Sequence, residues 1–136
     1  MILSILLAIL ACSLGGALGG FVLARPDEAA IRIAAGPWGE QAGRVQARVI
    51  GAMLLVSHGA TAAFLGYAPA LGSAMALTLS FLWFGAAAGH GLSMARGQAS
   101  ERVNLWMALA ELGMAALLLA PFLRLGHAAA RSINYL

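Results

Sequence analysis

Long uninterrupted apolar runs dominate the chain, and the longest extends from Val49 to Ala95 without one Asp, Glu, Lys or Arg. Because a helix that crosses a bilayer needs about 20 apolar residues, this run is long enough for two crossings. The break between them is predicted at residues 66–69, which read GYAP, since glycine weakens a helix and proline removes a backbone donor. The pattern therefore predicts an antiparallel membrane hairpin with spans at about residues 49–66 and 70–89.

Two further apolar runs flank this hairpin. Residues 2–24 carry no charge and predict a first span, and residues 103–123 predict a fourth. Between the first two spans, residues 25–48 form the longest polar stretch. It begins with Pro26 and Asp27, a pair typical of a helix start, so a short helix at the membrane interface is predicted there.

The fold predicted from this pattern is all-α. It is a four-transmembrane-helix bundle with a short interfacial helix between spans one and two, in a single membrane domain over residues 1–136. Composition agrees: 62% of the residues are hydrophobic and 10% are charged, whereas an average soluble domain has roughly 25% charged residues. The bilayer is the expected partner, a homo-oligomer or a larger membrane protein remains open, and a net charge of +3 gives no reason to expect nucleic acid.

The arginines predict the orientation, because cytoplasmic loops of membrane proteins are enriched in Lys and Arg. All basic residues here are Arg, and most of them lie in the connections after spans one and three. These connections are therefore predicted to be cytoplasmic, with both termini periplasmic in a bacterial inner membrane. The connections contain Arg25, Arg32, Arg44, Arg48, Arg96 and Arg102, and the carboxyl-terminal tail contains Arg124 and Arg131.

Glu111 is the one acid inside a predicted span. It lies about 12 Å below the start of the fourth span at a rise of about 1.5 Å per residue, near the middle of a hydrocarbon core about 30 Å thick. An ionised carboxylate at that depth is costly, so we expect it to face the bundle interior and to be paired or protonated. Asn104, Ala108 and Ala115 share its helical stripe and are polar or small.

His58 is the predicted partner of Glu111. It lies in the second span, which enters from the same side as the fourth, at a depth of about 13 Å by the same rise. Arg48 lies on the stripe that would lead from the cytoplasm to this level. Together with Asn104, these residues form a candidate ligand- or proton-binding site. The alternative is a polar clasp that holds two spans in register.

His90 and Arg96 are candidates at the membrane interface, at the cytoplasmic end of the third span. Haem held by His58 and His90 is not favoured, because their depths differ by about 10 Å. No spacing of Cys, His and Asp is typical of a zinc site, so we expect neither a metal nor a cofactor. Trp83 is assigned to packing in the third span.

Glycines cluster in two of the predicted spans. Residues 15–20 contain two overlapping Gly-xxx-Gly repeats, and residues 85–91 read GAAAGHG. Helix backbones approach closely where side chains are missing. Both clusters are therefore predicted to mark close helix crossings.

Three stretches of the chain carry a resemblance to a known family: residues 46–51 (QARVIG), residues 84–93 (FGAAAGHGLS) and the acid within residues 110–112 (AEL). Together they resemble a family of small bacterial four-helix membrane proteins known only as a domain of unknown function. The resemblance covers about residues 44–125 and implies the four-helix architecture without an activity. In the proteins it resembles, arginine often stands where this chain has His90, and this difference argues against an anion site there.

The sequence leaves three functions open. The leading hypothesis is a small non-enzymatic accessory or assembly component that packs through Gly/Ala-rich helix faces. The alternative is a proton-coupled carrier or a binder of small hydrophobic molecules, centred on Glu111 and His58. A third reading, a lipid- or quinone-modifying enzyme, would need a group of polar side chains at the interface. The candidates are His90, Arg96, Glu101 and Arg102.

Overall fold

The structure is a computed structural model that describes the backbone of residues 2–33, 39–97 and 101–133. Side chains are described for residues 2–29, 42–97 and 102–123.

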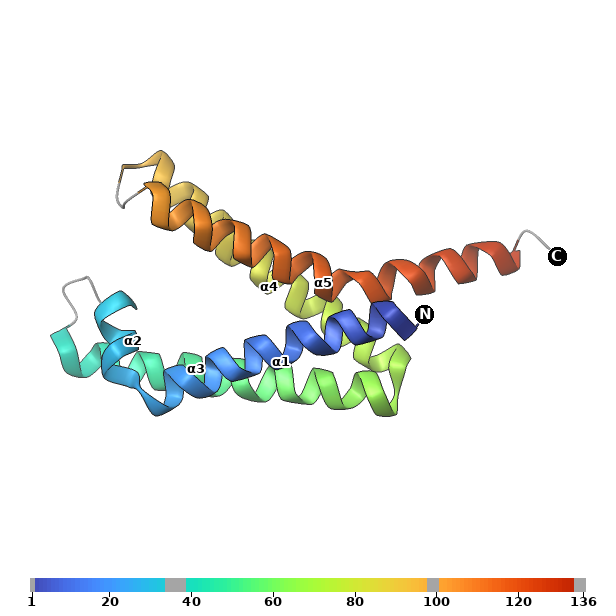
Figure 1. The fold of residues 1–136 in the computed structure, drawn as a ribbon, viewed down its shortest axis with the longest axis horizontal. Helices are drawn as coiled ribbons and strands as arrows, with labels where there is room; N and C mark the ends of the chain where they lie inside the picture. The colour runs from blue at the N-terminus through green and yellow to red at the C-terminus, as the bar shows by residue number, and fades with distance from the viewer. Residues whose placement is uncertain (1, 34–38, 98–100, 134–136) are drawn as a thin grey trace.

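The described residues form five helices and no strand (Figure 1). Four of the helices contain an apolar stretch long enough to cross a membrane. The predicted all-α bundle of four transmembrane helices is therefore confirmed, with one short helix between the first two. The helices are α1 (Ile2–Ala24), α2 (Pro26–Ile33), α3 (Gly39–Tyr67), α4 (Pro69–Ala95) and α5 (Glu101–Ile133).

The four long helices form a ring. α1 packs against α3 and α5, and α4 packs against the same two helices on the other side of the ring. The most extensive contacts are between α1 and α3 and between α4 and α5. We call α1 and α3 the first pair, and α4 and α5 the second pair.

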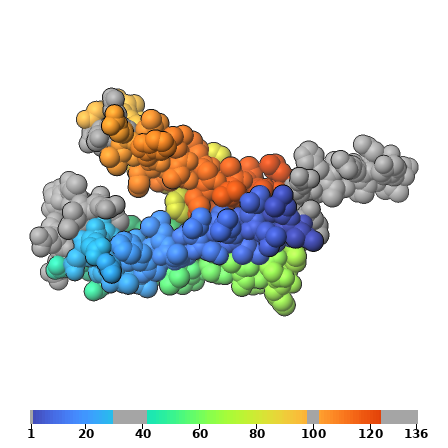
Figure 2. All heavy atoms as spheres, in the orientation of Figure 1, coloured from blue at the N-terminus to red at the C-terminus, as the bar shows by residue number. Residues whose placement is uncertain are grey.

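The two pairs converge at one end of the molecule and diverge at the other (Figure 1). At the closed end lie the start of α1 and the turn between α3 and α4. At the open end lie α2, the start of α3, the end of α4 and the start of α5. The space-filling view shows the two pairs in contact near the closed end and a notch between them towards the open end (Figure 2).

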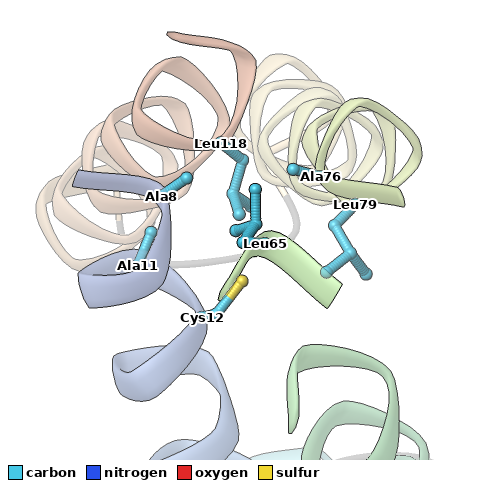
Figure 3. Packing of buried hydrophobic residues seen from close by; sticks show 7 residues of the cluster. All are labelled: Ala8, Ala11, Cys12, Leu65, Ala76, Leu79 and Leu118. Carbon is cyan, nitrogen blue, oxygen red and sulfur yellow. The ribbon is translucent and has the colours of Figure 1, made fainter. Parts of the chain in front are cut away.

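A hydrophobic core that includes all four long helices fills the closed end. Leu65 of α3 and Leu118 of α5 are fully buried and extend towards one another at its centre (Figure 3). Four of the other buried members of the cluster have small side chains, which allows the helices to approach closely. The cluster consists of Ala8, Ala11, Cys12, Leu65, Ala76, Leu79 and Leu118.

The first pair is held together by glycine-mediated backbone contacts along its length. A Cβ atom added to Gly19 would lie 2.7 Å from the carbonyl oxygen of Gly51, and one added to Gly51 would lie 2.6 Å from the backbone nitrogen of Leu23. No side chain larger than hydrogen fits at either position. The close crossing predicted from the glycines of residues 15–20 is confirmed.

α3 and α4 diverge because the side chains between them become larger away from their turn. Near the turn, a Cβ on Gly72 would lie 2.6 Å from the Cα of Leu65, so the two backbones touch. Further along, the rings of His58 and Trp83 fill the space, with centroids 5.8 Å apart. This gradient of side-chain size separates the two pairs towards the open end.

The polar segment after α1 folds back onto the first pair. α2 begins at Pro26, as predicted, and packs against α3. Its Asp27 accepts a hydrogen bond from Arg44 of α3 at 3.3 Å, and its Ala29 is buried against Ala47 and Val22. This small apolar cluster contains residues of α1, α2 and α3 only.

Two helices extend further than the predicted spans. α4 continues to Ala95, well past the predicted end at residue 89, and α5 continues through Pro121 to Ile133. α5 changes direction in its last third (Figure 1). A proline within a helix removes one backbone hydrogen bond and bends the helix without ending it where the flanking turns remain intact.

Candidate functional site

The first polar site joins the two helix pairs midway along the bundle. His58 of α3 is 1% exposed, and its Nε2 accepts a hydrogen bond from Nε1–H of Trp83 in α4 at 3.0 Å. Because Nε2 accepts, the ring proton is on Nδ1, which donates to the carbonyl oxygen of Leu54 at 2.8 Å. A neutral imidazole therefore has both nitrogens satisfied.

α1 holds the His58 ring from the opposite side. Gly15 packs directly on the ring, so that an added Cβ would overlap with Cδ2 and Nε2 and would lie 3.0 Å from Cε1. Its neighbour Gly16 is farther away, and an added Cβ there would be in ordinary contact with His58 Cβ at 3.8 Å. His58 thus lies where α1, α3 and α4 meet.

The second polar site lies within the second pair, nearer to the open end. Nδ1 of His90 in α4 is 2.8 Å from Oε2 of Glu111 in α5, and 3.2 Å from the carbonyl oxygen of Ala86. Glu111 is 8% exposed, whereas the side chain of His90 is 26% exposed. The carboxylate faces the bundle interior as predicted, and the imidazole covers it.

The predicted contact between His58 and Glu111 is wrong. α3 and α5 lie diagonally across the ring and are not neighbours in the part of the chain that the structure describes. The depth argument matched two residues at the same level, but membrane depth does not determine which helices are adjacent. His90, which was assigned to the interface, is the partner, because α4 continues past it to Ala95 and forms a hairpin with α5.

The remaining predicted site residues do not gather around either polar site. Asn104 is half-buried on the same stripe of α5 as Glu111 and Ala108. Arg48 is exposed on α3, in the other helix pair from Glu111, and Arg96 is exposed directly after the end of α4.

A third polar link was not expected from the sequence. Ser80 of α4 is 1% exposed and donates to the carbonyl oxygen of Ala115 in α5 at 2.9 Å. Thr61 and Ser73 are also buried, but they bond to carbonyl oxygens of their own helices. Among the side chains described, no buried nitrogen or oxygen lacks a hydrogen-bond partner.

No helix of the described chain makes the close crossing predicted at residues 85–91. An added Cβ at Gly85, Gly89 or Gly91 would meet nothing within 4 Å. In this half of α4 the first pair has already diverged, and α5 packs against another face that includes Ala87 and His90. The glycine-rich face is therefore open in the structure.

Trp83 is the functional group that sequence reasoning missed. An indole N–H within an apolar span needs an acceptor, and His58 lies on the preceding span of the same hairpin. Residues at similar distances from the turn of a helical hairpin lie opposite one another. By this reasoning His90 and Glu111 could also have been paired, because they lie on adjacent antiparallel helices on either side of one turn.

The contact between His90 and Glu111 links α4 to α5 within the second pair. Buried polar links of this kind hold neighbouring helices together in membrane bundles.

No group of three His, Cys, Asp or Glu side chains that could hold a metal ion occurs among the described residues. Comparisons with protein-family models, with curated proteins and with solved structures found no match to this chain. The fold and the two sites therefore define a multi-pass helical membrane protein and leave its role to be inferred from its geometry.

Proposed function

We propose that this chain is a non-enzymatic accessory protein that joins a larger membrane assembly through helix packing. The proposal rests on one observation: polar side chains within the membrane-spanning helices bond to neighbouring helices. His58 with Trp83, Ser80 with the Ala115 carbonyl, and His90 with Glu111 each link two helices. Polar residues inside a bilayer that do not bind a solute serve as interhelical links.

The open glycine face of α4 supports the proposal that the chain joins a larger membrane assembly. α1 uses its glycines against the backbone of α3, whereas Gly85 and Gly89 have free space above them. They are four residues apart and therefore share one helix face. A neighbouring helix gains packing energy from such a face. We assign the arginine-bearing end to the cytoplasm and the termini to the periplasm of a bacterial inner membrane.

The test is purification from native membranes in lipid nanodiscs, without detergent. We expect a stoichiometric partner, and we expect Gly85→Leu with Gly89→Leu to lose it. Gly59→Leu is the matched control, because Gly59 on α3 also has open space. Purification of the unaltered chain as a lone monomer would contradict the proposal.

A second candidate function is a proton-coupled carrier or binder, centred on Glu111 with His90 rather than with His58. The observation in its favour is the 26% exposure of the His90 side chain, which gives the buried carboxylate a neighbour with access from outside. Glu111→Gln keeps the shape and the hydrogen bonding but removes the titration. A loss of proton flux in liposomes on this substitution would favour the carrier over the accessory protein.

A further inference from the structure

We infer that the notch between the two helix pairs binds one anionic phospholipid from the leaflet at the open end. An acyl chain lies between the pairs, and the phosphate lies near arginines of both pairs. This inference does not depend on whether the chain joins a larger assembly.

The helices make the notch by sharing a core at one end only. The cluster around Leu65 and Leu118 includes all four long helices. Towards the open end, the cluster of Val22, Ala29 and Ala47 belongs to the first pair with α2, and the His90–Glu111 bond belongs to the second pair. Each pair is therefore stabilised internally where it diverges from the other (Figure 2).

The depth of the notch matches one leaflet. The hydrogen bond between His58 and Trp83 joins the pairs, and beyond it α4 continues from Trp83 to Ala95. At about 1.5 Å per residue this segment is about 18 Å long, and half of a hydrocarbon core of about 30 Å is about 15 Å. An acyl chain that enters from the open end can therefore reach the level of Trp83.

The same depth argues against a transmembrane helix as the occupant. A spanning helix needs the full hydrocarbon thickness of about 30 Å. The core at the closed end fills the second half of that path with Leu65, Leu118 and their neighbours. A lipid chain ends in the middle of the bilayer, so it fits a notch that also ends there.

Charge at the open end selects the headgroup. Of the described arginines there, Arg25 and Arg44 form ion pairs with the acids of α2. Among the described side chains, Arg48 of the first pair and Arg96 and Arg102 of the second form none, and all three are exposed. Arginines near a membrane surface attract anionic lipids, so a negatively charged phosphodiester headgroup is favoured over a zwitterionic one.

The experiment uses Trp83 as a reporter at the inner end of the notch. The full chain with Trp38→Phe and Trp106→Phe is reconstituted in phosphatidylcholine with a small fraction of lipid brominated in its acyl chain. We expect brominated phosphatidylglycerol to quench Trp83 more strongly than brominated phosphatidylcholine does at low salt. Each contributing arginine should raise the relative affinity of the notch for phosphatidylglycerol by about fivefold. Added salt should reduce the difference.

Trp106 is the internal control, because it is 68% exposed on the outer surface of α5. The fluorescence of the chain with both substitutions is subtracted from that of the chain with Trp38→Phe alone, which leaves the signal of Trp106. The quenching of Trp106 should not depend on the lipid headgroup. Arg48→Gln with Arg96→Gln should reduce the preference at Trp83 by about 25-fold, at about fivefold for each arginine, without abolishing it, because Arg102 remains. Arg124→Gln with Arg131→Gln removes the same charge from the tail and should keep it.

Three results would overturn the inference. The first is equal quenching of Trp83 by both brominated lipids. The second is a preference that neither Arg48→Gln with Arg96→Gln nor high salt reduces. The third is protection of Trp83 from both lipids together with a cross-linked dimer, which would show that a second copy occupies the notch.

Discussion

Replacing Gly15 with alanine tests the junction of α1, α3 and α4 directly. The new methyl group would overlap with Cδ2 and Nε2 of His58. Carbon atoms in contact lie roughly 3.5–4.0 Å apart, so the ring must move by about 1 Å or α1 must move away. Either movement disturbs the hydrogen bond to Trp83, whose donor and acceptor are 3.0 Å apart.

The expected loss of unfolding free energy follows from three contributions. Overpacking of a tight contact costs about 1–3 kcal/mol, and a lost hydrogen bond costs about 0.5–1.5 kcal/mol. Alanine in place of glycine stabilises a helix by about 1 kcal/mol. We therefore expect Gly15→Ala to destabilise the protein by roughly 0.5–3.5 kcal/mol.

The measurement is the unfolding free energy in mixed micelles, with Gly16→Ala as the matched control. Gly16 is the next residue on the same helix, and its added Cβ would make only an ordinary contact of 3.8 Å with His58. The helix-propensity gain is the same for both variants and cancels in the comparison. Equal stability of the two variants would refute the packing of His58 on Gly15.

Three further experiments test the polar links in the same assay. Trp83→Phe removes the indole donor and leaves a buried acceptor unsatisfied, so a loss of about 1–3 kcal/mol is expected, whereas Trp106→Phe on the outer surface should have no effect. A double-mutant cycle of His90→Gln and Glu111→Gln should give a coupling of about 0.6–1.7 kcal/mol, as for polar links in membrane bundles; a coupling of zero would show that the two side chains do not interact. Ser80→Ala should cost about 0.5–1.5 kcal/mol, and an unchanged stability would contradict its link to α5.

Hydrophobic patterning was sufficient to predict the membrane helices. The charge-free run from Val49 to Ala95 contains most of α3 and all of α4, and the turn falls within the predicted GYAP segment. Helix propensity and apolar length are local properties, so they can be obtained from one sequence. The inward direction of Glu111 could also be predicted, because an isolated carboxylate is costly next to lipid.

The partner of Glu111 could not be predicted from depth alone. In a bilayer, lipid and protein interiors are similarly apolar, so hydrophobicity does not determine which helices become neighbours. Short-range packing decides this, through contacts such as Gly72 on the backbone of Leu65. For the same reason the glycines of residues 85–91 could not be assigned a partner, since a glycine face permits a close crossing without specifying which helix makes it.

The divergence of the two helix pairs is the central claim, and spin-label distances in lipid nanodiscs test it most directly. Labels are introduced by cysteine substitution, with Cys12 replaced by alanine. One pair of labels, at Ala24 and Val103, reports on α1 and α5 at the open end, and the other, at Leu6 and Phe122, reports on the closed end; all four positions are exposed. We predict a longer distance for Ala24–Val103 than for Leu6–Phe122. Equal distances at the two ends would show parallel helices and contradict the notch.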